Sequence, residues 1–279
     1  MPVRPAPMTP PTSTSIAGAG HPAAGRDPVI SAEVLGVPLA LIDYAGTLEW
    51  IDAAVAERRR AYICVAAVHT VMACDEDPEL RAAVLAADLT VPDGQPLVWA
   101  LRTLGHPLKS RVYGPDLMDA ACARAARTGQ RFYLYGGRNP GALAQLARQL
   151  RLRHPGLQIV GGQAPPFRPL TPREEERVAE DVNRSRADVV WVGIGVPKQE
   201  KWMAQMRDRL DAPVLVGVGA AFDFHAGLIP QAPAWLQRHG MEWAFRLAHE
   251  PRRLWRRYLR YNPRFVAGFV RQLARERRP

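Results

Sequence analysis

One acidic tripeptide stands where a sheet of parallel strands would place a catalytic group. Asp93 lies in Pro92-Asp93-Gly94, directly after the apolar run 89–91, which predicts a short strand. A carboxylate at the end of that strand could act as a general base that removes the proton from an attacking hydroxyl. Proline, aspartate and glycine each also favour turns, so an ordinary turn is the simpler interpretation of the tripeptide taken alone.

Glycines at two other predicted strand ends could bind a phosphate group. Gly136 follows the run 131–135, and Gly195 follows the run 189–192. Glycine lets backbone amides approach a phosphate at the N-terminus of the next helix. Neither segment is a G-x-G-x-x-G fingerprint or has the lysine of a P-loop. A tight turn between strand and helix explains Gly136 equally well.

Further polar side chains follow predicted strands. Gln199 falls in the first turn of a helix predicted over 198–210, where it could hydrogen-bond a sugar or a nucleobase. Glu200 beside it could instead complement the helix dipole. Asp223 follows the small residues of Gly217-Val218-Gly219-Ala220, which would let a ligand approach, although it could equally cap a turn.

Histidine and cysteine give weaker signals. His69 follows a strand predicted over 62–68 and could face the same crevice, but a lone histidine is more often structural. No His, Cys, Asp or Glu cluster has the spacing of metal ligands, so the sequence predicts no bound metal and no cofactor. Cys64, Cys74 and Cys122 form no C-x-x-C pair and are expected to be reduced, buried thiols of a cytosolic protein.

Alternating strands and helices would bring these groups together. The expected strands are 37–42, 62–68, 89–91, 131–135, 157–160, 189–192 and 214–218. The expected helices are 47–59, 78–86, 95–104, 115–127, 140–150, 171–183 and 198–210. This order predicts an α/β fold with a largely parallel sheet covered by helices on both faces. Ligands of such sheets bind beyond the carboxyl ends of the strands, so the candidate groups would line one crevice.

Composition divides the 279-residue chain into three parts. Residues 1–28 are rich in Pro, Ala, Ser, Thr and Gly without apolar periodicity, which predicts disorder, and they lack the apolar run of a secretory signal. Residues 29–232 are expected to form the α/β domain. Residues 233–279 show only helical patterns and are predicted to form a basic amphipathic appendage.

The appendage contains much of the positive charge of a chain whose formal net charge is +10. Arginines beside Trp255 and Tyr258 on amphipathic helices are typical of proteins that bind an anionic membrane surface. Helices that dock on the domain with a solvated basic face are the alternative. No nucleic-acid-binding module accompanies the charge, so no nucleic acid is expected as a partner. No apolar run reaches the roughly 18 to 20 residues that span a bilayer, so any membrane contact would be peripheral.

These segments, taken in order, resemble the WecG/TagA/CpsF family of glycosyltransferases, glycosyltransferase family 26, over residues 34–259. The resemblance rests on the following segments: Asp77-Pro78-Glu79-Leu80, Ala87-Asp88-Leu89, Pro92-Asp93-Gly94, Arg111-Val112, Gly114-Pro115-Asp116-Leu117-Met118, Gly193 to Trp202, Gly217-Val218-Gly219-Ala220, Phe222-Asp223, Gly227, Pro233, Trp235-Leu236, Glu242-Trp243, Arg246-Leu247 and Glu250-Pro251-Arg252-Arg253. Each segment alone is weak, but the ordered set is specific.

The resemblance implies an inverting, metal-independent transferase with a Rossmann-like fold. It implies a UDP-sugar donor and a polyprenyl-diphosphate-linked saccharide acceptor, used in bacterial surface polysaccharide synthesis at the inner face of the cell membrane. The proposed base of the family matches Asp93, and its pocket glutamine matches Gln199. The family's arginines that are proposed to reach the acceptor diphosphate match Arg246, Arg253 and Arg256.

One segment departs from the family pattern. Members commonly have T-x-N at the end of the second strand, with the asparagine near the donor sugar, whereas this chain has Val65-Ala66-Ala67. The methyl group of Ala67 cannot hydrogen-bond a sugar, which leaves the donor open. It also leaves open a non-catalytic, membrane-associated scaffold that binds nucleotide sugars. Separately, the sequence leaves the oligomeric state open, including self-association into a homo-oligomer.

A dehydrogenase on a doubly wound sheet is a further alternative. It requires a glycine fingerprint after the first strand, and Asp43-Tyr44-Ala45-Gly46-Thr47 does not fit that pattern.

Overall fold

The computed structural model describes residues 29–277, apart from the side chains of Ala234, Arg238 and Arg253. The segment 1–28, for which the sequence predicts disorder, therefore lies outside the described residues.

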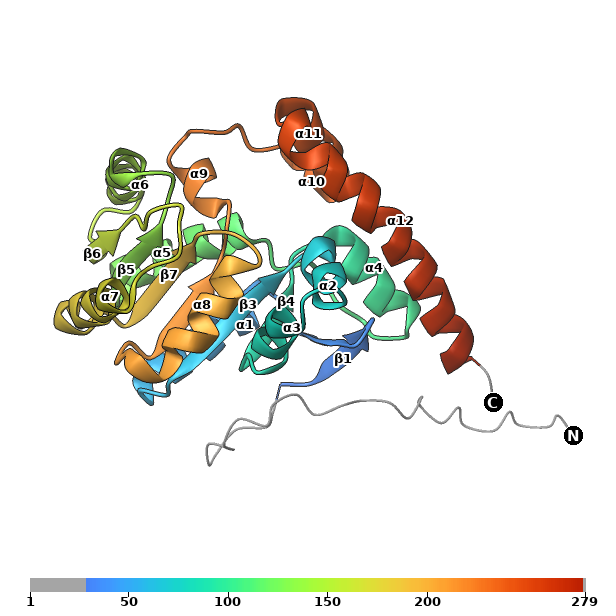
Figure 1. Cartoon of the computed structure of the whole chain (residues 1–279), viewed down its shortest axis with the longest axis horizontal. Coiled ribbons are helices and arrows are strands. Elements are labelled where there is room, and N and C mark those ends of the chain that lie inside the picture. The colour runs from blue at the N-terminus through green and yellow to red at the C-terminus, as the bar shows by residue number, and fades with distance from the viewer. Residues whose placement is uncertain (1–28, 278–279) are drawn as a thin grey trace, which may run out of the picture.

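A six-stranded parallel sheet forms the centre of the protein (Figure 1). Its strand order is β4-β3-β8-β7-β5-β6. The bounds are β3 (Ala61–Ala66), β4 (Leu89–Pro92), β5 (Arg131–Gly136), β6 (Gln158–Gln163), β7 (Val189–Gly193) and β8 (Val214–Gly217). Every neighbouring pair is parallel, which confirms the predicted α/β class.

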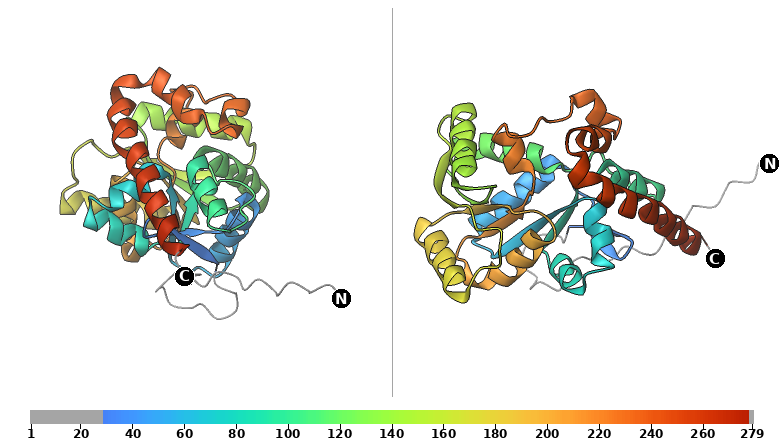
Figure 2. Two further views of the ribbon diagram at one scale, coloured as in Figure 1. Left: turned by 90° about the vertical axis from the view of Figure 1, so that its right-hand side faces the viewer. Right: turned by 45° about the horizontal axis from the view of Figure 1, so that its top comes forward.

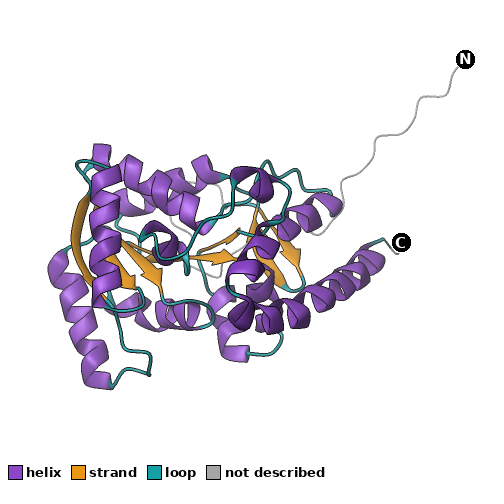
Figure 3. Ribbon diagram, turned by 90° about the horizontal axis from the view of Figure 1, so that it is seen from above, coloured by secondary structure: helices purple, strands orange, loops and turns teal. Residues whose placement is uncertain are grey.

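Helices cover both faces of this sheet, as seen from above in Figure 3. One face packs against α1 (Tyr44–Ala56), α5 (Gly114–Thr128), α6 (Pro140–Arg153) and α9 (Ala221–His225). The other packs against α2 (Val68–Cys74), α3 (Pro78–Leu85), α4 (Gln95–Thr103), α7 (Pro172–Ser185) and α8 (Lys198–Met206), which the 3₁₀ turn η1 (Arg207–Arg209) continues. Alternate residues of a strand enter opposite cores, so Phe132 lies on one side and Tyr133 on the other.

The predicted first strand does not belong to the main sheet. Residues 37–42 were expected to begin it, but β2 (Val37–Ala40) pairs antiparallel with β1 (Ser31–Val34) in a separate hairpin. Leu35 and Gly36 both adopt positive φ, of 52° and 77°, and so form the tight connection between the strands. Gly36 is compatible with this backbone because it has no Cβ atom.

Three helices follow the sheet: α10 (Ala234–Arg238), α11 (Glu242–His249) and α12 (Pro251–Glu276). Helix α12 is continuous through Pro263, which lies in its interior. Pro263 removes one N–H donor from the helix, and the buried side chain of Phe265 anchors the turn that follows it.

Contacts along its length hold α12 against the main domain. Glu76, after α2, pairs with Arg264 and with Arg260, whose Nη2 lies 2.9 Å from its Oε2. Near the C-terminus, Gln272 donates to the Glu33 carbonyl at 2.8 Å and accepts from the Leu35 amide at 2.9 Å. Figure 2 shows the resulting course of α12, from α11 to the β1–β2 hairpin.

Candidate active site

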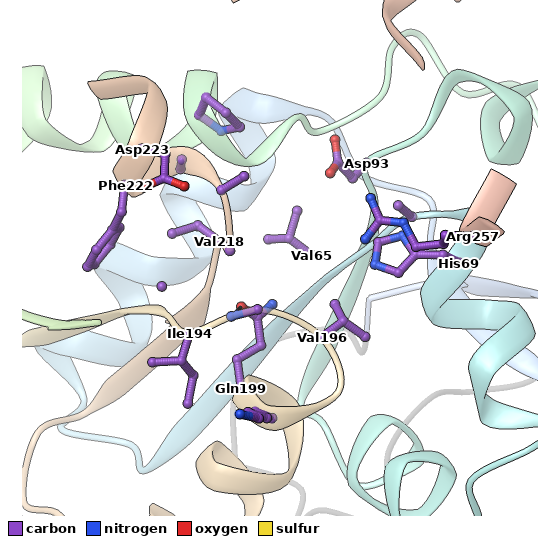
Figure 4. A pocket seen from close by; sticks show the side chains of 18 of the residues that line it. Val65, His69, Asp93, Ile194, Val196, Gln199, Val218, Phe222, Asp223 and Arg257 are labelled. Atoms are coloured by element: carbon purple, nitrogen blue, oxygen red, sulfur yellow. Dashed lines mark hydrogen bonds between the residues drawn. The ribbon is translucent and has the colours of Figure 1, made fainter. Parts of the chain in front are cut away.

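A cavity of about 980 Å³ opens at the carboxyl ends of the strands. The loops after β3, β4, β5, β7 and β8 contribute to its wall, as does the helical appendage of α10 to α12. Figure 4 shows Asp93 with His69 and Arg257 on one side, Asp223 and Phe222 on the opposite side, and Gln199 between them. The crevice predicted from the order of strands and helices is therefore present, and residues of α11 and α12 form part of its wall.

Asp93 lies in this cavity immediately after β4. Its amide donates to the Ala66 carbonyl at 2.8 Å, which extends the β3–β4 pairing by one residue and fixes the backbone. Burial raises the pKa of the Asp93 carboxyl to about 7. Arg111 and Arg246 act against this rise, while Glu242 and Asp116 add to it. A carboxyl with a pKa near neutrality can both exist as a base and retain a proton after it has accepted one.

Arg111 lines the same cavity as Asp93, and its charge lowers the pKa of that carboxyl. Its side chain is held on several sides. Its Nη2 donates to Glu242 Oε2 at 2.7 Å and to Gln237 Oε1 at 3.0 Å. Its guanidinium carbon lies 4.3 Å from the centre of the Tyr113 ring. Arg111 and Glu242 belong to segments of the family pattern, but the sequence alone assigns neither a role. They are 131 positions apart, so nothing in the local sequence indicates that they are in contact.

His69 lines the same side of the cavity. Burial lowers the pKa of its imidazole to about 3, and the neighbouring charges of Arg257 and Arg246 act in the same direction. The imidazole is therefore neutral at physiological pH. In that form it can offer one donor and one acceptor to a bound ligand but no charge.

Gln199 also lines the cavity, although its side chain is almost fully buried. Its Oε1 accepts from the Gly195 amide at 3.2 Å, and its Nε2 donates to Glu200 Oε1 at 2.9 Å. Gly195 itself lines the cavity with φ of +80° and open space where a Cβ atom would stand. The amide of Gln199 thus braces the β7–α8 loop and presents its remaining Nε2 hydrogen to other acceptors.

Gly136, the last residue of β5, and Gly137, which follows it, differ in their surroundings. A Cβ atom on Gly136 would lie 2.5 Å from the Gly193 carbonyl oxygen, so this glycine permits the close packing of β5 on β7. Gly137, and not Gly136, is among the residues that line the cavity in the described chain. This geometry favours the turn interpretation for Gly136 over a direct contact with phosphate.

Asp223 reaches the cavity from the first turn of α9, where it forms a two-bond ion pair with Arg138. Arg138 Nε donates to Asp223 Oδ1 at 3.0 Å, and Arg138 Nη2 donates to Oδ2 at 3.1 Å. Both side chains line the cavity. A ligand at this end would therefore meet a paired carboxylate and guanidinium instead of a single charge.

A sequence model described as the Glycosyl transferase WecG/TagA/CpsF family matches residues 32–279. The chain belongs to this family. It is also similar to a protein of Bacillus spizizenii (strain ATCC 23059 / NRRL B-14472 / W23) named N-acetylglucosaminyldiphosphoundecaprenol N-acetyl-beta-D-mannosaminyltransferase. The two are 30% identical over 196 residues, which cover 70% of this chain and 73% of that protein.

The arginines that the WecG/TagA/CpsF resemblance assigned to the acceptor lie in different places. Arg246 lines the cavity, with its guanidinium carbon 5.5 Å from the centre of the Phe224 ring. Arg256 is exposed, lies over the Trp255 ring and is not among the described lining residues, whereas Arg257 is. One step along a helix turns a side chain by about 100°, which separates these two arginines. The side chain of Arg253 lies outside the described part of the structure.

Ala67 lines the cavity of this glycosyltransferase at the start of α2. The residue that departs from the T-x-N pattern of the resemblance therefore presents a methyl group to the cavity. Within residues 29–277, no group of three or more His, Cys, Asp and Glu side chains is arranged to hold a metal ion. In the same residues, no helix is both long enough and apolar enough to span a membrane.

Proposed function

We propose that this family member is an inverting, metal-independent glycosyltransferase that transfers a hexose, an N-acetylhexosamine or its uronic acid from a UDP-sugar. The acceptor is a polyprenyl-diphosphate-linked saccharide, and the product serves bacterial surface polysaccharide synthesis. The observation that supports this most is Asp93, a buried carboxyl with a pKa near neutrality in a cavity of about 980 Å³. The name of the Bacillus relative, which acts on N-acetylglucosaminyldiphosphoundecaprenol, supports the acceptor class.

The reaction is a direct displacement at the anomeric carbon of the donor sugar. A hydroxyl oxygen of the acceptor forms the new bond, the bond to UDP breaks, and UDP leaves with the electron pair. Asp93 takes the hydroxyl proton as the bond forms. Because the leaving diphosphate and the acceptor diphosphate are both anionic, the cationic side of the cavity around Arg246 and Arg257 stabilises them.

The acceptor is a lipid, so the enzyme works at the cytoplasmic face of the cell membrane as a peripheral protein. The outer face of α12 fits this location, because its exposed apolar side chains recur at helical spacing among arginines. They are Trp255, Leu259, Val266 and Val270, with 47% to 68% of each side chain exposed. An amphipathic helix of this kind binds anionic lipid through both apolar burial and charge.

Ala67 supports one alternative, a scaffold of the same fold that binds nucleotide sugars without transferring them. The missing side-chain donor and acceptor at this point of the cavity would weaken contact with the donor sugar.

A donor screen decides between these functions. Purified protein is incubated with UDP-N-acetylmannosamine, its uronic acid or UDP-glucose and a short polyprenyl-diphosphate-linked N-acetylglucosamine. UDP release, the product mass and the anomeric configuration are measured. We expect one donor to give a glycosylated lipid with inverted configuration. UDP binding without product for every donor would favour the scaffold.

A further inference from the structure

We propose that Glu242, the first residue of α11, is a positioning residue that holds Arg111 beside Asp93 and thereby couples the docked helical appendage to the catalytic base. The inference rests on the proposed function, because it assigns Asp93 as the base.

The contact between Glu242 and Arg111 is short and enclosed. Glu242 Oε2 lies 2.7 Å from Arg111 Nη2, and the two side chains are only 9% and 12% exposed. Gln237 of α10 accepts a second bond from the same nitrogen at 3.0 Å. The guanidinium carbon of Arg111 lies 4.3 Å from the centre of the Tyr113 ring. Two of these three partners belong to the appendage, so its docking fixes where the guanidinium lies.

A buried ion pair between two parts of a fold needs a reason beyond stability. Desolvation of both ions offsets much of their attraction, and apolar residues of similar size often stabilise as well. Here Arg111, Glu242 and Asp93 line one cavity, and the two charges of the pair act on the pKa of Asp93 in opposite directions. Arg111 favours the ionised carboxylate of Asp93, while Glu242 opposes it.

The other charged and titratable groups around Asp93 come from several elements. Arg246 of α11 favours its ionised form, whereas Asp116 of α5 opposes it. Arg257 of α12 is a further cation on the Asp93 side of the cavity (Figure 4). Tyr44 and Tyr113 both have pKa values raised by burial, and His69 is neutral, so these three groups add no charge near pH 7. Glu242 is thus the acidic group that both raises the pKa of Asp93 and binds Arg111, the cation that lowers this pKa most.

Two substitutions separate the charge of Glu242 from its anchoring role. Glu242→Gln keeps an oxygen that can accept from Arg111 but removes the negative charge, so the pKa of Asp93 falls. We expect the acidic limb of the kcat/KM profile to move to lower pH by about 0.5 to 1 unit. Glu242→Ala removes the anchor, and we expect kcat to fall by roughly one to two orders of magnitude while the donor KM changes little.

Glu76→Gln is the matched control, because it weakens the α12 anchor at Arg260 and Arg264 and leaves the Glu242–Arg111 contact in place. It should change neither the pH profile nor kcat strongly. Equal losses of kcat in Glu76→Gln and Glu242→Ala would overturn the proposal, since appendage docking alone would then explain both. An unmoved acidic limb in Glu242→Gln would also overturn it.

A second readout works without turnover. Thermal unfolding across pH 5 to 9 is compared for wild type and Asp93→Asn, and again in the Glu242→Gln background. The pH at which the Asp93-dependent difference changes reports the pKa of Asp93 in the folded protein. A lower midpoint in the Glu242→Gln background supports the coupling even if no donor is turned over, and an identical midpoint contradicts it whether or not the protein is a transferase.

Discussion

Glu200→Gln should remove a pH-dependent loss of stability. The Glu200 side chain is fully buried in α8, one of its oxygens accepts from Gln199, and the other has no hydrogen-bond partner in the described structure. Burial raises the pKa of this carboxyl from 4.5 to about 7. Because the folded-state pKa is the higher one, the group favours folding below pH 4.5, and this contribution is lost as pH rises through 7.

The difference in pKa sets the size of the effect. One pKa unit corresponds to about 1.4 kcal/mol, so a carboxyl that moves from 4.5 to about 7 on folding loses about 3 kcal/mol by pH 8. Glutamine has nearly the same shape and no proton to release, so the variant should not show this loss. For a domain of this size, about 3 kcal/mol corresponds to a difference in Tm of roughly 6 to 12 °C.

The assay is thermal unfolding of wild type and Glu200→Gln at intervals between pH 5 and pH 8. The Tm of the variant relative to wild type should rise steadily across this range. Glu49→Gln, at an exposed position of α1, is the control and should show no such trend. Parallel Tm curves for wild type and Glu200→Gln would refute the reasoning, since they would mean that Glu200 is ionised and solvated in the folded protein.

Three further predictions concern substrates and membrane. Ala67→Asn should change the order in which UDP-sugar donors rank by kcat/KM while leaving Tm nearly unchanged. An unchanged order would show that residue 67 does not determine donor selectivity. Transfer should continue in excess EDTA, whereas loss of turnover that magnesium or manganese restores would contradict a metal-independent reaction. Trp255→Glu with Leu259→Glu should weaken co-sedimentation with anionic vesicles by roughly tenfold or more, because apolar burial is lost. The control Leu152→Glu, at an exposed leucine of α6, should not weaken vesicle binding. Equal vesicle binding by the control and the α12 double variant would exclude α12 as the membrane-docking surface.

The scaffold of the site was predictable because it depends on local patterns. Apolar runs that end in glycine or in Pro92-Asp93-Gly94 identified most strands of the parallel sheet and the edge at which their loops meet. The buried cysteines without disulfide partners were also predicted correctly. Helix α2 was missed because its apolar residues continue the run of β3 without a break.

The contacts that give the site its electrostatics were not predictable from one sequence. Glu242 meets Arg111 only because the chain returns across the sheet edge after β8. The family resemblance assigns Arg256 to the acceptor, whereas the next residue along α12, Arg257, is the one among the described residues that lines the cavity. The pKa of Asp93 depends on burial under helices that lie far away in the sequence, so the tripeptide alone could not distinguish a base from a turn.

The most direct test of the central claim is the transfer rate of Asp93→Asn, measured beside its affinity for UDP by calorimetry. The substitution keeps the shape of the side chain and removes the base. We predict that transfer falls by about 10²- to 10⁴-fold while UDP binding and the fold remain essentially unchanged. Transfer near the wild-type rate would contradict the assignment of Asp93 as the catalytic base.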